Sequence, residues 1–153
     1  MKSIKTLFLA AMVIIVAVMS TKAFAGEYTH STPGINGYDP VAYFTDGKSV
    51  KGNGYHVADY EGVIYVFANK KNRKVFEANP EKYIPAYGGY CAYGVAVGKK
   101  FIADPNVWEV VDGKLYLNLD NKIKGIWVKD VPGNISKANA NWPTIKNKAP
   151  SEL

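Results

Sequence analysis

The sequence predicts an α+β domain, and three observations support this fold class. Two runs of β-forming residues each contain a Gly-centred turn, at Glu61-Gly62 and at Asp112-Gly113, and so predict two β-hairpins. Short helical patterns precede, separate and follow these hairpins. The regular strand–helix alternation of a parallel sheet is missing. We therefore expect one small domain over residues 37–145, built from two hairpins and several short helices.

The first 25 residues have the features of a secretory signal peptide. Lys2 and Lys5 precede an unbroken apolar run of 13 residues, and Ala23-Phe24-Ala25 then supplies a small-x-small cleavage pattern. The run is short for a transmembrane helix, which needs roughly 20 apolar residues. No cysteine follows the cleavage pattern, which argues against a lipid anchor. We expect cleavage after Ala25, a periplasmic or secreted location, and no stable membrane anchor after cleavage.

The composition of the mature chain limits the classes of protein to which it can belong. Cleavage leaves 128 residues, enough for one domain with a hydrophobic core, and lowers the net charge from +6 to +3. The remaining lysines are scattered and do not form the concentrated basic stripe of a nucleic-acid-binding protein. We therefore exclude nucleic acid as a partner. The mature chain keeps all 11 Tyr but no Met, and its one cysteine, Cys91, means that the fold forms without an internal disulfide.

The first half of the domain begins after a lead-in of turn-forming residues at positions 26–36, which we expect to be flexible. Asp39 followed by Pro40 predicts a helix start, with Asp as N-cap and Pro at the first helical position. The first hairpin spans Tyr55 to Ala68. Because its second strand is apolar on both faces, we expect that strand to be central and covered on both sides.

Two further helical segments lie between the hairpins. Asn69 can cap a helix over residues 70–78, and Pro80 starts a short turn that runs to Tyr83.

The second hairpin runs from Trp108 to Asn118, and its Asp112-Gly113 pair fits a type I′ turn with positive φ at both positions. The second arms of the two hairpins are alike, Glu-Gly-Val-Ile-Tyr-Val against Asp-Gly-Lys-Leu-Tyr-Leu, which suggests two similar units. Helical patterns follow, and residues 146–153 read as a disordered tail.

One stretch, residues 87–94 (Tyr-Gly-Gly-Tyr-Cys-Ala-Tyr-Gly), could carry chemistry. Cys91 stands where a helix over residues 91–97 would begin. The free N–H groups and positive dipole end of that helix would favour the thiolate and lower the thiol pKa. Tyr87, Tyr90 and Tyr93 would form an aromatic pocket around the sulfur. The alternative is a buried cysteine that acts as a small apolar residue.

Metal binding is limited by the number of available ligands. The mature chain has one Cys, two His (His30 and His56) and no Met, so one chain cannot build a four-ligand Cys or Cys/His zinc site. Paired-Cys and Met-rich copper sites are excluded for the same reason. A metal ion would have to use Cys91 with one His and carboxylates, or a site shared between chains. No cofactor is firmly implied, and a metal ion stays an open alternative.

Several motifs together resemble the YHS-domain family, in particular its exported branch. The resemblance covers Gly37 to about Ile145. It rests on Gly-Tyr-Asp-Pro-Val-Ala-Tyr-Phe at 37–44, Phe-Ala-Asn at 67–69, Asn-Pro-Glu-Lys-Tyr at 79–83, Tyr-Gly-Gly-Tyr-Cys-Ala-Tyr at 87–93, Leu-Tyr-Leu-Asn at 115–118 and Asn-Trp-Pro at 141–143.

The chain departs from the metal-associated branch of that family, such as the domains attached to copper-transporting ATPases. Cysteines of that branch correspond to Ala42, Ala68 and Asn72, and the His and Ser that name the family correspond to Tyr60 and Asn69. The resemblance therefore does not carry a metal role over to this chain.

The exported branch is similar in placing a cysteine after Gly-Gly-aromatic, which Cys91 matches. Some members of that branch are selenoproteins with selenocysteine at this position, which implies a functional role for Cys91. Ala86 departs from that branch, where a Gln often precedes the Tyr.

Three functions from different classes remain. The leading hypothesis is a thiol-dependent redox protein in which Cys91 is the nucleophile, its pKa lies below the ordinary value of about 8.5, and Tyr87, Tyr90 and Tyr93 shape the pocket. Since the chain has no resolving cysteine, an external thiol or reductase would be its partner. The second is a non-catalytic module that binds a small ligand or metal ion beside Cys91 and the tyrosines. The third is a structural or interaction protein.

Overall fold

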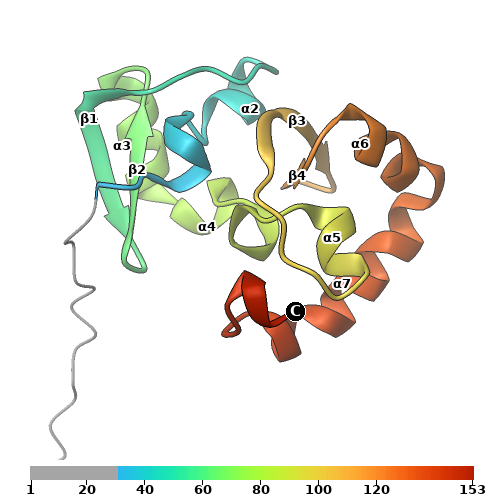
Figure 1. Cartoon of the computed structure of the whole chain (residues 1–153). Helices are drawn as coiled ribbons and strands as arrows, with labels where there is room; N and C mark the ends of the chain where they lie inside the picture. Colours follow the sequence, from blue (N-terminus) through green and yellow to red (C-terminus); the bar gives the residue numbers. More distant parts are fainter. Residues whose placement is uncertain (1–30) are drawn as a thin grey trace, which may run out of the picture.

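The structure, a computed structural model, describes residues 31–153 (Figure 1). The expected signal peptide, the first part of the lead-in and His30 lie outside the described residues. Within residues 31–153, no helix combines the length and the apolar character that crossing a bilayer requires.

The described chain is a single α+β domain of short helices and two antiparallel two-stranded sheets, which confirms the predicted fold class. The first half contains η2 (Gly34–Gly37), α2 (Ala42–Thr45), β1 (Asn53–Tyr60), β2 (Val63–Phe67), α3 (Lys70–Ala78) and α4 (Pro80–Tyr83). The second half contains η3 (Ala86–Gly89), α5 (Ala92–Ala96), β3 (Asp104–Val111), β4 (Lys114–Asn118), α6 (Asn121–Trp127), η4 (Val128–Asp130), α7 (Val131–Ile145) and η5 (Pro150–Glu152).

Local sequence signals predicted most of these helices and strands correctly. Asn69 caps α3 by accepting a hydrogen bond from the Asn72 N–H at 2.9 Å. Pro80 begins α4. The second hairpin turns at Asp112 (φ 50°) and Gly113 (φ 73°), as a type I′ turn requires.

The expectation of a central strand was wrong. Within residues 31–153, β2 pairs only with β1, so it has one neighbour. Tyr65 and Phe67 point into the core, whereas Ile64 and Val66 on the other face are only half-buried. Helical segments rather than strands cover the inner face, since η2 and α3 pack on β2. An apolar outer face therefore does not require a second sheet neighbour.

The domain is built from two structurally equivalent units, which we call the first unit (residues 34–83) and the second unit (residues 86–145). Each opens with a tight turn in the left-handed region. Ile35 (φ 52°, ψ 37°) in η2 corresponds to Tyr87 (φ 55°, ψ 34°) in η3, and Gly37 (φ 82°) corresponds to Gly89 (φ 84°). Left-handed backbone is uncommon outside glycine, so the recurrence of this turn is a specific sign of repetition.

The hairpins repeat as well, 51 residues apart. Asn53 pairs with Phe67 in the first unit and Asp104 pairs with Asn118 in the second, and each pairing is followed by an irregularity in the register. A capped helix then follows each hairpin, with Asp120 in α6 taking the place of Asn69 in α3. The likeness of the two hairpin arms therefore extends to whole units, which lie side by side in Figure 1.

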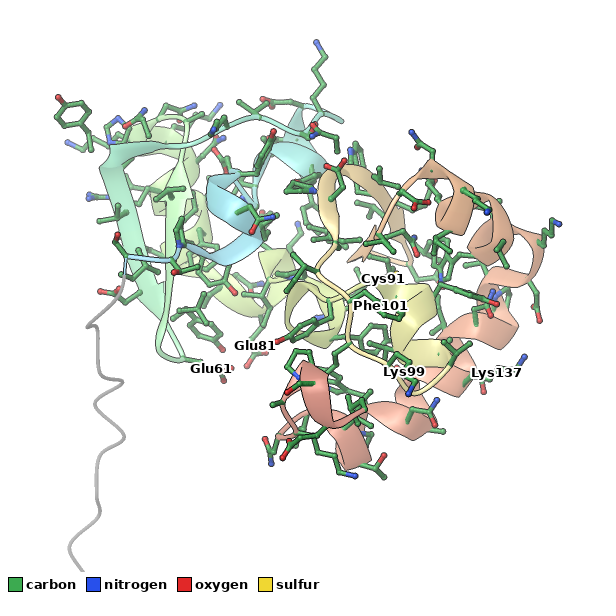
Figure 2. All side chains as sticks on the ribbon, viewed as in Figure 1. Glu61, Glu81, Cys91, Lys99, Phe101 and Lys137 are labelled. Carbon is green, nitrogen blue, oxygen red and sulfur yellow. The ribbon has the colours of Figure 1, made fainter. Side chains whose placement is uncertain are left out.

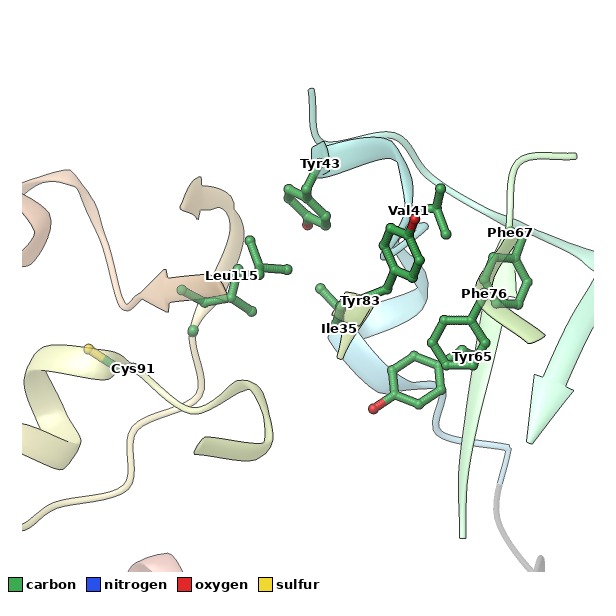
Figure 3. Close-up of a cluster of buried hydrophobic side chains, with 11 residues drawn as sticks. Ile35, Val41, Tyr43, Tyr65, Phe67, Phe76, Tyr83, Cys91 and Leu115 are labelled. Atoms are coloured by element: carbon green, nitrogen blue, oxygen red, sulfur yellow. The ribbon is translucent and has the colours of Figure 1, made fainter. Parts of the chain in front are cut away.

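The two units share one hydrophobic core. The first cluster joins aromatic residues of the first unit, such as Tyr43 and Phe76, to Leu115, Leu117 and Cys91 of the second (Figure 3). A second cluster lies between α5, α6 and α7 around the fully buried Trp127. Leu115 and Leu117 on β4 thus face the other unit, while their neighbour Tyr116 faces the second cluster.

Both ends of the described chain make contacts with the core. Ile35 in the lead-in is buried in the first cluster. Residues 146–153 include η5, and Leu153 packs against the second cluster. Lys100 also holds the C-terminal end in place. It is a buried residue whose ammonium donates to the carbonyl oxygens of Lys146 (3.2 Å) and Lys148 (2.6 Å).

Candidate functional site

Cys91 is the N-cap of α5, close to the predicted helix start. Its Sγ accepts a hydrogen bond from the Gly94 N–H at 3.3 Å, and it lies 3.7 Å from Oδ1 of Asn118, to which the thiol donates. The side chain is 0% exposed. Figure 2 shows Cys91 inside the second unit, next to Phe101. The sulfur is therefore at a helix start, as expected, but is closed off from solvent.

Burial decides the acidity of this thiol. The N–H groups of Gly94, Leu119 and Tyr93 lower the pKa of Cys91, but desolvation is the larger effect and raises it above its ordinary value. The expectation of a lowered pKa was wrong, because sequence spacing shows the helix start and not the exclusion of water.

Asp39 occupies the equivalent place in the first unit. It is 0% exposed, and its Oδ1 accepts from the N–H groups of Val41 (2.9 Å) and Ala42 (3.4 Å). Its Oδ2 accepts from the Ala68 N–H (2.9 Å) and from Nδ2 of Asn72 (2.7 Å). One carboxylate thus holds together α2, the end of β2 and α3.

The surroundings of Asp39 bear on the metal role of the YHS family. Ala42, Ala68 and Asn72, the three positions that correspond to cysteines of the metal-associated branch, all donate to this carboxylate. These donors occupy the carboxylate oxygens that a cation would use, and N–H groups cannot themselves bind a cation. Among residues 31–153 there is also no group of three or more His, Cys, Asp or Glu placed to hold a metal ion. These residues do not fit a metal.

The three predicted pocket tyrosines do not surround one site. Tyr87 lines a cleft of about 360 Å³, and its hydroxyl donates to Oδ1 of Asn139 at 2.9 Å. Tyr90 lines a separate cavity of about 180 Å³ between the two opening turns. The Tyr93 N–H donates to Oδ1 of Asn118, and its ring packs against both core clusters. Neither Cys91 nor Tyr93 lines either cavity.

The larger of these two spaces, which Tyr87 lines, lies between the first hairpin, η3 and α7. We call it the aromatic cleft. Four aromatic side chains line it, together with a carboxylate, an ammonium group and small apolar residues. Its lining consists of Tyr60, Glu61, Val63, Tyr65, Ile84, Pro85, Ala86, Tyr87, Gly88, Lys114 and Trp142.

Sequence reasoning identified Tyr87 but missed the rest of this cleft. Tyr60 and Tyr65 lie in the first hairpin and Trp142 lies in α7, far along the chain, and no local spacing signals their convergence. The polar partner of Cys91, Asn118, was also missed, although it belongs to a segment that carries the YHS resemblance.

Comparison with known proteins supports part of the family resemblance. The sequence model of the YHS domain matches residues 41–87, which cover most of the first unit and the start of η3. Cys91 lies beyond the matched segment. Neither the curated proteins nor the solved structures contain a match to this chain.

Proposed function

We propose that this YHS-domain protein is a non-catalytic binding module that holds a small organic ligand in the aromatic cleft. The observation that carries this proposal is the cleft itself. Its volume of about 360 Å³ lies in the range typical of small-molecule sites, and it has four aromatic residues in its lining. Aromatic side chains offer large apolar contact areas, and tyrosine adds a polar group that orients a ligand.

The charged groups of the cleft suggest what the ligand carries. Glu61, at the turn of the first hairpin, and Lys114, at the start of β4, both belong to the lining and are of opposite sign. A small molecule with an apolar body and one ionised group satisfies this arrangement, since either charge can pair with it.

The alternative, in which Cys91 is an external nucleophile, receives less support. A catalytic nucleophile that turns over rapidly needs access to its substrate and a lowered pKa. Cys91 is 0% exposed and burial raises its pKa. The aromatic cleft, by contrast, opens to solvent without any movement of the core.

The binding proposal is tested by filling the cleft. Val63 lines it and is 37% exposed, and we expect Val63→Trp to abolish the binding of small aromatic and aliphatic acids and amines. Ligand-observed NMR with a library of such fragments measures binding, and the cross-peaks of Gly88 and of the Trp142 indole N–H locate it.

The matched control is Val57→Trp, on β1, where Val57 is 42% exposed and outside the cleft. This variant should bind the same fragments as the wild-type chain, and circular dichroism should show both variants folded. Fragments that bind Val63→Trp and wild type equally, or that shift neither cross-peak, would contradict the proposal.

We also propose that the protein works outside the cytoplasm. Its positive start, 13-residue apolar run and Ala23-Phe24-Ala25 pattern support removal of residues 1–25. The intact mass of protein recovered from the periplasm or medium should correspond to a chain that starts at Gly26. Recovery of the uncleaved chain in the cytoplasm would refute export.

A further inference from the structure

The structural equivalence of Asp39 and Cys91 shows what kind of group the second unit can hold. Cys91 is the N-cap of α5 and accepts from Gly94, and Asp39 lies two residues before the N-cap of α2, Val41, and accepts from Val41 and Ala42. Each residue follows a left-handed turn, and both are 0% exposed. The backbone N–H of Asp39 donates to Val50, and that of Cys91 donates to Phe101, at 2.8 and 3.0 Å. The two side chains therefore enter corresponding places in the two units.

The hydrogen-bond donors correspond as well. In the first unit the Asp39 carboxylate accepts from two N–H groups of its own helix start and from Ala68 after β2. In the second unit the Gly94 N–H donates to the sulfur of Cys91 at 3.3 Å, and the Tyr93 N–H donates to Oδ1 of Asn118 beside it. The N–H groups of Tyr93 and of Leu119, after β4, also lie near enough to lower the thiol pKa. Three of the four donors around the carboxylate thus have counterparts around the thiol.

A side-chain amide occupies the fourth position around each residue, and only the amide of the first unit donates to it. Asn72 donates its Nδ2 to Asp39 at 2.7 Å. Asn118 lies against Cys91 through Oδ1, which also accepts from the Tyr93 N–H, and its Nδ2 is buried without a hydrogen-bond partner among residues 31–153. An unpaired buried donor costs free energy, and a thiol is only a weak acceptor. The second unit therefore has more donor capacity than its thiol can use.

We propose that Cys91 is a modification site whose sulfinate form, with two oxygen atoms on the sulfur, completes this donor cluster. A cysteine sulfinate carries its two oxygens on the atom bonded to Cβ, as an aspartate does. It is therefore the sulfur analogue of the carboxylate that the first unit holds. Rotation of the Asn118 amide by half a turn presents Nδ2 to one of the new oxygens and releases the Tyr93 N–H from Oδ1, so that this N–H donates to the other new oxygen, as the Val41 N–H donates to Asp39.

The oxidant is a hydroperoxide, and the chemistry takes two steps. The sulfur attacks one peroxide oxygen, an S–O bond forms, the O–O bond breaks, and the other oxygen leaves as water or an alcohol, which gives the sulfenic acid. A second hydroperoxide repeats the step and gives the sulfinic acid, which loses its proton. Each step removes two electrons from sulfur and transfers them to the peroxide.

Phe101 controls access to the sulfur. A Cβ added at Gly94 would lie 2.9 Å from the Phe101 ring, so this ring covers the helix start that surrounds Cys91. The Phe101 side chain is itself 45% exposed and belongs to neither of the two core clusters. Phe101→Ala is therefore expected to accelerate oxidation of Cys91.

Two variants test the donor cluster without any oxidant. Cys91→Asp supplies the two oxygens permanently, and Cys91→Asn is its uncharged isostere. We expect the folding equilibrium constant of Cys91→Asp, measured by urea denaturation, to exceed that of Cys91→Asn at least tenfold. An Asp variant that folds no better than the Asn variant would overturn the proposal.

Peroxide treatment of the mature chain tests the modification itself. This chain has no Met, so Cys91 is its only sulfur and the reading by mass spectrometry is unambiguous. Hydrogen peroxide should add two oxygen atoms to Cys91, faster in Phe101→Ala, and raise the urea midpoint. The rise should be smaller in Asn118→Leu, which lacks the fourth donor. The proposal would be refuted if Cys91 resisted oxidation in both the wild-type chain and Phe101→Ala, or if oxidation lowered the urea midpoint.

Discussion

Replacing Asp39 by alanine is expected to reduce the free energy of unfolding by about 3–4 kcal/mol, the largest effect of any single polar substitution in the first unit. The carboxylate is 0% exposed and accepts four hydrogen bonds, from Val41, Ala42, Ala68 and Asn72. Its removal leaves these donors buried without an acceptor. Because it joins three elements, α2, β2 and α3 lose their common attachment point together. Urea denaturation followed by circular dichroism measures the change.

Asp46→Ala provides the control for this substitution. Asp46 follows α2 and is exposed, with one side-chain hydrogen bond, from Thr45. Its loss should change the unfolding free energy by less than about 0.5 kcal/mol. Equal effects at the two positions would show that the buried carboxylate does not hold the first unit together.

Alkaline pH is expected to unfold the protein between pH 10 and 12. Burial raises the pKa of Tyr65 and of Tyr87 from 10.0 to about 12, and it raises that of Tyr43 further still. In this interval the unfolded chain loses phenol protons that the folded chain keeps, so the unfolding free energy falls as pH rises. Each tyrosine protonated only in the folded state contributes a fall of about 1.4 kcal/mol per pH unit. Below pH 10 this stabilisation is fully present.

Two phenylalanine substitutions check the cause of the alkaline transition. Tyr65→Phe removes a buried phenol, so its stability should decline less steeply with pH than that of the wild-type chain. Tyr55→Phe removes a phenol that is 91% exposed and should leave the decline unchanged. Urea midpoints measured from pH 8 to 12 give the slopes, and identical slopes for both variants would exclude buried phenols as the cause.

The elements that sequence reasoning placed correctly are those fixed by short-range chemistry. Asn69 and Pro80 mark helix starts through capping and through the fixed φ of proline. The start predicted at Asp39-Pro40 is two residues early, since α2 begins at Ala42 with Val41 as N-cap. Asp112-Gly113 sets the second turn because both residues must take positive φ. Each of these signals spans only a few residues.

The features that sequence reasoning missed depend on distant contacts. The thiol pKa of Cys91 depends on burial by both units. The position of residues 146–153 depends on hydrogen bonds from Lys100, in a different segment. The same limit applies to the aromatic cleft. Residues from the first hairpin, η3 and α7 line it, and only the folded chain brings them together.

The repeated architecture has a consequence for how the molecule unfolds. Although each unit has its own turn, hairpin and capped helix, Leu115 and Leu117 of the second unit complete the core of the first. Neither half could separate without exposing this shared interior to water. The protein should therefore melt in one cooperative transition, and a chain cut in the link between α4 and η3 should not release two stable halves.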